Sequence, residues 1–272
     1  MSLLSAKRSA LLANIFAHGS CAVAYSGGVD SAVVAKAACL ALGDQAVAIT
    51  GTSASLATGE LEQAVEIARL IGIRHQVIQT EEFAQPAYLR NAPDRCYHCK
   101  TELYTQLEQV LPKLGVKVIL NGANADDAGD YRPGMAAATE HAVHSPLAEC
   151  GITKREVREL AAEWHMPVWD KPASPCLSSR VAYGEDVTPE RLAMVDSAEQ
   201  FLRTKGLRVC RVRYHRGDLA RIEVPAEALQ DLCEPVTRQE LAVELRRLGF
   251  KFVTIDLEGF RSGSLNQLLQ ID

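Results

Sequence analysis

The chain has 272 residues, which is long enough for two domains, and 47% of them are hydrophobic and 23% charged. This composition supports a packed core and excludes a disordered protein. The net charge of -5 disfavours a general nucleic-acid coat, because such a protein needs many cations to neutralise phosphates. The sequence has neither an apolar run of about eighteen residues, as a membrane span requires, nor a secretory signal pattern. The eight cysteines are scattered and fit reduced thiols or metal ligands, so we expect a cytoplasmic protein without a membrane partner.

In the first half of the chain, short apolar runs alternate with segments of helical spacing. The expected strands are residues 21–25, 46–50, 75–79 and 117–120, and the expected helices are residues 30–42, 60–71 and 101–113. Thr153 and Glu156 form a capping box that starts a further helix running to Trp164. This alternation predicts an α/β fold with a doubly wound parallel sheet. Ligands of such sheets bind beyond the carboxyl ends of the strands.

The pattern changes after about Gly184. Thr188 and Pro189 have the residue types preferred at the N-cap and first position of a helix, which we expect to run to about residue 205. Residues 207–214 and 219–224 then read as a hairpin. A second capping box at Thr237 and Glu240 predicts another helix, followed by a strand over residues 250–256. We therefore expect one domain over residues 1–184 and a smaller α+β domain over residues 185–272.

A glycine-rich turn lies between the first strand and the first helix of this α/β pattern. Its sequence is Ser26-Gly27-Gly28-Val29-Asp30-Ser31. Two glycines allow a tight turn that directs backbone N–H groups at a phosphate, the two serines can donate further bonds, and Asp30 can support Mg²⁺. No Gly-Lys-Ser/Thr follows, so this is not a kinase-type phosphate loop. The turn resembles the PP-loop of the ATP pyrophosphatase superfamily, whose members cleave ATP to AMP and pyrophosphate while adenylating a substrate.

Three other segments strengthen this resemblance. Thr50 and Thr52 end the second strand, where the superfamily commonly contacts adenine. The segment 121–127 ends a later strand, which puts Asn121, Gly122 and Asp126 on the ligand side of the sheet. Residues 145–158, which include Lys154, resemble a segment of the NAD and GMP synthetases. The alternative for Asp126 is a solvated turn that caps a helix.

The segment Pro175-Cys176-Leu177-Ser178-Ser179-Arg180 carries the more specific resemblance. An arginine beside a cysteine favours the thiolate, which is the form that attacks an activated carboxyl group. With residues 169–172 before it, the segment resembles the LarE family, and the likeness runs on to residues 259–264. LarE enzymes are pyridinium-3,5-bisthiocarboxylic acid mononucleotide synthases, which make the organic part of the nickel-pincer cofactor of lactate racemase. The resemblance implies that ATP adenylates each carboxylate of a pyridinium-3,5-dicarboxylate mononucleotide, with Asp30, Cys176 and Arg180 as catalytic residues.

The pair Cys96 and Cys99 departs from the sacrificial members of that family, in which one cysteine gives up its own sulfur and becomes dehydroalanine. A Cys-x-x-Cys pair can be a redox pair, two zinc ligands or two ligands of an iron–sulfur cluster. Some LarE-like proteins hold a [4Fe–4S] cluster on three cysteines, which here would be Cys96, Cys99 and Cys176, fed by a separate sulfide donor. A sacrificial Cys176 beside a bystander pair, and a zinc site or disulfide, are the alternatives. For the other five cysteines we expect core packing.

Seven cationic residues lie between Arg203 and Arg221, against the single acid Asp218. Arg211 and Arg213 alternate on one face of the expected hairpin, which suits binding of a phosphate or carboxylate. The family resemblance implies a substrate with such groups, so we expect Ser179, Arg180, Arg211 and Arg213 to bind it. Glu223 and Asp231 would hold these arginines or bind the ribose.

Three other functions compete with sulfur transfer to a small mononucleotide. A tRNA thiolase would use similar cysteines, but the acidic charge balance and the absence of an added basic domain disfavour it. An ammonia-using synthetase of the NAD or GMP type would leave Cys176 without a role. A nucleotide-binding module without catalysis would not explain the cysteine segment. The family resemblance also implies a homo-oligomer.

Overall fold

The computed structural model describes residues 3–129, 133–172, 174–261 and 264–265. The chain forms two compact units that both draw on separated stretches of sequence. Unit 1 consists of Met1–Ser53, Thr58–Glu82 and Cys96–Ser174, and unit 2 of Ala54–Ala57, Phe83–Arg95 and Pro175–Asp272. The domain boundary that we place at residue 184 remains a prediction. Among the described residues, no helix is long and apolar enough to cross a membrane.

Unit 1 is built on a four-stranded parallel sheet, as the sequence predicts. Its strands are β1 (Cys21–Ala24), β2 (Ala46–Thr52), β3 (Arg74–Gln79) and β4 (Val118–Leu120), in the order β3-β2-β1-β4. The registers of β1 pair Cys21 with Ala46 on one side and with Val118 on the other. The chain builds outward from β1 through β2 to β3 and then returns to the other side of β1. The carboxyl ends of β1 and β4 therefore flank the topological switch point, where ligands of such sheets bind.

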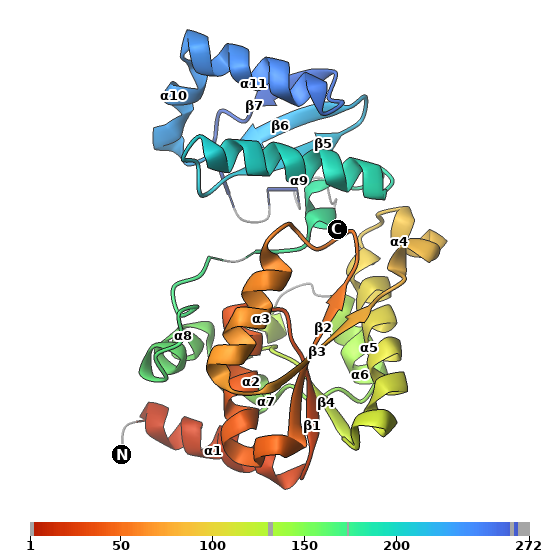
Figure 1. Ribbon diagram of the computed structural model, residues 1–272, viewed down its shortest axis with the longest axis vertical. Helices are drawn as coiled ribbons and strands as arrows, with labels where there is room; N and C mark the ends of the chain where they lie inside the picture. Colours follow the sequence, from red (N-terminus) through yellow and green to blue (C-terminus); the bar gives the residue numbers. More distant parts are fainter. Residues whose placement is uncertain (1–2, 130–132, 173, 262–263, 266–272) are drawn as a thin grey trace. The chain divides into compact units, whose positions relative to one another are not determined.

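Helices cover both faces of this sheet (Figure 1). On one face lie α1 (Leu3–Ala17), α2 (Val29–Leu42), α3 (Glu60–Ile71), α7 (Pro146–Glu149) and α8 (Lys154–Glu163), and on the other α5 (Arg95–Leu114) and α6 (Pro133–Glu140). The first face buries an alanine- and valine-rich stretch of α2 against β1 and β2. Small side chains let α2 lie close to the sheet, which fixes the position of its N-terminus.

Unit 2 holds a smaller mixed sheet in the order β5-β6-β7. Strands β5 (Arg211–His215) and β6 (Leu219–Glu223) form an antiparallel hairpin, and β7 (Phe252–Ile255) runs parallel to β6. Helix α9 (Pro189–Thr204) packs on β5 and helix α11 (Pro235–Arg247) on β7. The short helices α4 (Pro86–Leu89) and α10 (Leu229–Cys233) complete the unit. Thr188 caps α9 through its side chain, as predicted from the sequence.

Several local predictions are wrong. Helix α11 begins at Pro235 after Glu234, so Thr237 lies inside the helix and does not cap it. Proline at the first helical position sets the start three residues earlier than the capping pattern indicates. Helix α5 begins at Arg95, not near residue 101, which places Cys96 and Cys99 on its first turns. Strand β5 begins four residues later than predicted, and α1 was not predicted at all.

Candidate functional site

The glycine-rich turn after β1 is a closed network of short-range hydrogen bonds. The backbone N–H of Ser26 donates to Oγ of Ser31 at 3.2 Å, and that hydroxyl donates to the carbonyl of Gly28 at 3.1 Å. Gly27 has φ of +71°, and a Cβ on it would lie 2.9 Å from the Cβ of Ala64 on α3. Only glycine fits this position. These bonds fix the shape of the turn, which leads into the N-terminus of α2, where the helix dipole favours an anion.

The loop after β4 packs directly against this turn, as expected for the switch point. A Cβ on Gly122 would lie 2.8 Å from the backbone nitrogen of Ser31, so the two backbones approach at the contact limit. The side chain of Asn121 shapes the loop by accepting bonds from the N–H of Ala123 at 3.0 Å and from Oγ of Ser145 at 2.9 Å. The structure thus brings together two segments that are about ninety residues apart in the sequence.

Asp30 is the acidic residue of the glycine-rich turn, and its carboxylate pairs with a lysine. Its Oδ2 pairs with Nζ of Lys154, the first residue of α8, and its Oδ1 accepts a bond from Nδ2 of Asn124 at 3.3 Å. Asp126 is exposed, and its carboxylate accepts the backbone N–H of Lys154 at 2.8 Å. Carboxylate oxygens are the protein ligands that Mg²⁺ prefers. The carboxylate of Asp30 is therefore of the ligand type that fits Mg²⁺.

The end of β2 is only partly available to a ligand. Thr50 is buried, and its hydroxyl donates to the carbonyl of Tyr25 at 2.9 Å. The hydroxyl therefore accepts from Nε2 of His75 at 2.8 Å, which fixes the tautomer of that ring. Burial lowers the pKa of His75. Thr52 is half-buried, and its carbonyl accepts the N–H of Thr80 at 3.1 Å. Their role at adenine stays a prediction.

In unit 2, Cys176 is exposed at the start of a tight turn over residues 177–180. Its carbonyl accepts bonds from the N–H of Ser179 at 3.0 Å and from the hydroxyl of Ser179 at 2.8 Å. The next residue, Leu177, is buried and donates its N–H to the carbonyl of Ser55 at 2.8 Å. The thiol therefore stands on a backbone that is fixed on both sides.

Arg180 holds the backbone of this turn through hydrogen bonds. It is 1% exposed and donates from Nη1 to the carbonyls of Pro175 and Cys176, the latter at 3.0 Å. Its Nε donates to Glu199 at 3.1 Å, and Glu199 is fully buried. The guanidinium holds the backbone of Cys176 and has its charge compensated. A catalytic or substrate-binding role for Arg180 stays a prediction, and the contacts described above are those of a positioning residue.

The arginines of β5 lie among buried acids. Arg213 donates to Glu223 at 2.8 and 3.1 Å and to the carbonyl of Ser179 at 3.0 Å. Burial alone would raise the pKa of Glu223, but bonds from Arg213 and Ser264 outweigh it and lower the pKa. Arg211 is half-buried over the ring of Phe260, and burial together with neighbouring arginines lowers its pKa.

Glu223 and Asp231, both predicted to hold the arginines or bind substrate, differ in burial. Glu223 is buried among arginines, as the prediction that it holds them requires. Asp231 is exposed on α10, and no bond between it and these arginines is among the described contacts. Both assignments as substrate ligands remain predictions.

Cys96 and Cys99 lie three residues apart on the first turns of α5, so both thiols lie toward one side of that helix. Within the described residues, no group of three or more His, Cys, Asp or Glu side chains is arranged to hold a metal ion. Arg95, the residue before Cys96, is buried in unit 2 and donates to the carbonyl of Ser178 at 2.7 Å.

The remaining cysteines divide by burial. Cys21 and Cys210 are buried, and burial raises the pKa of their thiols to about 12 and about 11. Cys39 and Cys150 are half-buried, and burial also raises the pKa of Cys150. Cys233 is exposed on α10, so the prediction of core packing is wrong for it.

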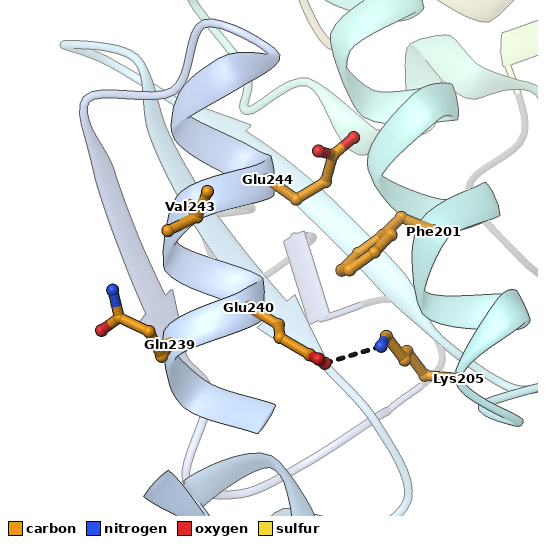
Figure 2. Close-up of a pocket in the computed structure, with 6 residues that line it drawn as sticks. All are labelled: Phe201, Lys205, Gln239, Glu240, Val243 and Glu244. Carbon is orange, nitrogen blue, oxygen red and sulfur yellow. Dashed lines mark hydrogen bonds and ion pairs between the residues drawn. The ribbon is translucent and has the colours of Figure 1, made fainter. Parts of the chain in front are cut away.

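A shallow pocket of about 350 Å³ lies between α9 and α11 (Figure 2). Across this pocket, Nζ of Lys205 forms an ion pair with Glu240 at 2.6 Å and also lies over the ring of Phe201. The other lining residues are Gln239, Val243 and Glu244. None of the predicted site residues lines this pocket.

Sequence reasoning missed three residues that shape the site: Glu199, Arg95 and Asn91. Glu199 lies on the buried stripe of α9 with Leu192, Val195 and Leu202, which was a signal that could have identified it. Arg95 donates to Asn91 four residues earlier, but the bonds that tie both residues to the Cys176 segment gave no such signal, because those partners are more than eighty residues away in the sequence.

No family model matches the chain, but comparison with individual proteins is informative. A pyridinium-3,5-bisthiocarboxylic acid mononucleotide synthase of Lactiplantibacillus plantarum is 36% identical over 270 residues, which cover 99% of this chain and 97% of that protein. An uncharacterised Synechocystis protein is 49% identical over 247 residues, or 91% and 92% of the two chains. A tRNA-specific 2-thiouridylase MnmA of Xanthobacter autotrophicus is 30% identical over 191 residues, but these cover 56% of this chain and 49% of that protein.

Proposed function

Because the chain belongs to the family of pyridinium-3,5-bisthiocarboxylic acid mononucleotide synthases, we propose that it transfers sulfur to a pyridinium-3,5-dicarboxylate mononucleotide at the expense of ATP. The products would be the thiocarboxylates of the nickel-pincer cofactor precursor, with AMP and pyrophosphate. The observation that supports the proposal is a hydrogen-bonded glycine-rich turn at the switch point of unit 1 in the same chain as an exposed cysteine on a fixed backbone.

The residues of unit 1 fit the activation of a carboxylate by ATP. A carboxylate resists attack because of its charge and because oxide is a poor leaving group, whereas AMP leaves readily. The turn formed by Ser26, Gly27, Gly28, Val29 and Ser31 would bind the phosphates through backbone N–H groups and hydroxyls. Asn121, Gly122 and Asp126 form the facing loop. Mg²⁺ held by Asp30 would supply charge neutralisation at the phosphates.

Cys176 would act on the adenylated carboxyl group. Its thiolate attacks the carbonyl carbon, a thioester forms and AMP leaves with the electron pair of the broken C–O bond. Removal of the Cα proton of Cys176 then breaks the Cβ–S bond, which leaves a thiocarboxylate on the substrate and dehydroalanine in the protein. The exposed thiol and the fixed backbone around it support this role.

A [4Fe–4S] cluster on Cys96, Cys99 and Cys176 would spare Cys176 and use a separate sulfide donor. Cys96 and Cys99 belong to unit 1 and Cys176 to unit 2, and we assign no step to a cluster. The cluster remains a prediction from the sequence, as does the homo-oligomer. Iron and acid-labile sulfide analysis of anaerobically purified protein tests the cluster directly, with Cys96→Ala as the variant that should lose both.

The test of the proposed function combines product analysis with the mass of the intact chain. Anaerobic protein is incubated with ATP, Mg²⁺ and the dicarboxylate mononucleotide. We expect a thiolated product, AMP, and chains that have lost the mass of H2S at Cys176. Cys176→Ala should give no thiolated product, whereas Cys233→Ala, which removes another exposed thiol, should behave as wild type. If the product contains more than one transferred sulfur per protein chain and Cys176 stays intact, the sulfur comes from a replenished donor and not from Cys176.

The same assay separates the competing functions. If tRNA accepts sulfur and the mononucleotide does not, the protein is a tRNA thiolase, to which the partial likeness to the 2-thiouridylases points. If ammonia yields an amide and Cys176→Ala stays active, it is an amidating synthetase. If ATP is bound but AMP never forms with either substrate, the enzymatic proposal fails.

A further inference from the structure

In this structure the carboxylate of Asp30 forms an ion pair with the side chain of Lys154. Nζ of Lys154 pairs with Oδ2 of Asp30, and Nδ2 of Asn124 donates to Oδ1. The pair joins the N-terminus of α8 to that of α2 within unit 1. The side chains of Lys154 and Asp30 are 38% and 25% exposed, so either can exchange its partner without opening the core.

A magnesium ion and the Lys154 ammonium group compete for this carboxylate. A metal bound at Oδ2 would take the position of Nζ, and two cations at that separation repel each other strongly. Of the neighbouring acids, exposed Asp126 accepts the backbone N–H of Lys154 at one oxygen, and buried Asp127 accepts the backbone N–H of Asn124. A nucleotide triphosphate on the adjacent turn would offer the ammonium group a new anion.

We propose that Lys154 keeps divalent cations off Asp30 until a triphosphate is bound. This inference rests on the proposed ATP site and adds the order in which the triphosphate and the divalent cation bind there. The phosphates draw Lys154 from Asp30, and the released carboxylate then takes Mg²⁺. A purely structural ion pair would persist with nucleotide bound, and Asp30 would take no part in metal binding.

Mn²⁺ alone is the probe, because it takes the same oxygen ligands as Mg²⁺ and its binding is measured by electron paramagnetic resonance. The full-length protein is titrated without nucleotide. Lys154→Met and Lys154→Gln should bind Mn²⁺ at least about tenfold more tightly than wild type, given the one to three log units by which a neighbouring charge shifts a carboxylate equilibrium. Lys154→Arg keeps the charge and should behave as wild type. Lys117→Met removes an exposed lysine and is the matched control.

The double variant Lys154→Met with Asp30→Asn should lose the gained Mn²⁺ affinity, which assigns the metal to Asp30. Equal Mn²⁺ affinity of wild type and Lys154→Met, with both folded by circular dichroism, would overturn the proposal. Calorimetry with α,β-methylene-ATP measures nucleotide binding separately. If no nucleotide binds to wild type, the proposed ATP site fails, while the metal titration still reports on the ion pair. If neither neutral variant folds, the proposal is tested on the wild-type protein. Added nucleotide must then increase Mn²⁺ binding beyond what the nucleotide binds by itself, and Asp30→Asn must abolish that increase.

Discussion

Replacing Glu199 with glutamine tests whether a buried ion pair supports the turn that carries Cys176. The Glu199 carboxylate is fully buried and accepts from Arg180 at 3.1 and 3.4 Å, from Arg203 at 3.1 Å and from the N–H of Val212 at 3.2 Å. Glutamine keeps the shape but removes the charge, and its amide nitrogen would face the donors of Arg180. The change leaves the 1% exposed guanidinium of Arg180 without compensation.

Breaking a buried pair by removing one partner costs about 3–5 kcal/mol. We expect Glu199→Gln to fall near the lower end, about 3 kcal/mol, because one amide oxygen still accepts. Arg203→Met is the matched control: Arg203 binds the same carboxylate but is 33% exposed, so its loss should cost about 1 kcal/mol or less.

The assay is urea unfolding followed by circular dichroism, together with hydrogen exchange of residues 176–180. Both tryptophans, Trp164 and Trp169, lie in unit 1, so their fluorescence reports on the other unit. Glu199→Gln should lower the dichroism midpoint and raise exchange in the turn. A loss below about 1 kcal/mol with unchanged exchange would refute the reasoning.

Three further predictions follow from the same contacts. Gly122→Ala should weaken ATP binding at least about tenfold, because its Cβ would lie 2.8 Å from the Ser31 nitrogen, whereas Gly151→Ala, with open space around it, should leave binding unchanged and cost only stability. The free energy of unfolding should fall as the pH drops through 6.5, because the lowered pKa of His75 means that the unfolded chain binds the proton more readily, and His75→Gln should flatten this slope. The Cys21 thiol, with a pKa of about 12, should resist iodoacetamide at neutral pH until urea unfolds the chain.

Each of these has a clear contrary result. Unchanged calorimetric ATP affinity in Gly122→Ala would mean that the two loops do not meet as described. Identical pH slopes of wild type and His75→Gln in urea unfolding would remove the proposed role of that ring. Mass-spectrometric labelling of Cys21 in the folded protein would contradict its burial.

The sequence predicts the part of unit 1 whose signals are local. The strand at Cys21, the glycine turn and the helix that follows are contiguous, so their types can be inferred from a few residues. The parallel sheet follows from the alternation of such pieces, and the structure confirms it. The pairing of Lys154 with Asp30 could not be predicted, because 124 residues separate them and only the crossover of the chain brings them together.

The arginine-rich segment over residues 203–221 shows what a local charge pattern does not predict. Its charge pattern predicts an anion site, but buried Glu199 pairs with Arg203, and buried Glu223 pairs with Arg213 and Arg221. A run of like charges does not reveal the acids that topology places opposite it. The helical stripe of α9 indicates that Glu199 faces inward, so periodicity combined with charge would have identified one of the two acids.

The central claim is that the enzyme adenylates a carboxylate and replaces its oxygen with sulfur. Mass spectrometry of AMP from a reaction with substrate labelled in its carboxylates with oxygen-18 tests this most directly. The account predicts AMP that carries one heavy oxygen for each thiocarboxylate formed, because the bond from carboxylate oxygen to phosphorus persists when the thiolate displaces AMP. Unlabelled AMP alongside thiolated product would show that ATP is not spent on the carboxylate and would contradict the account.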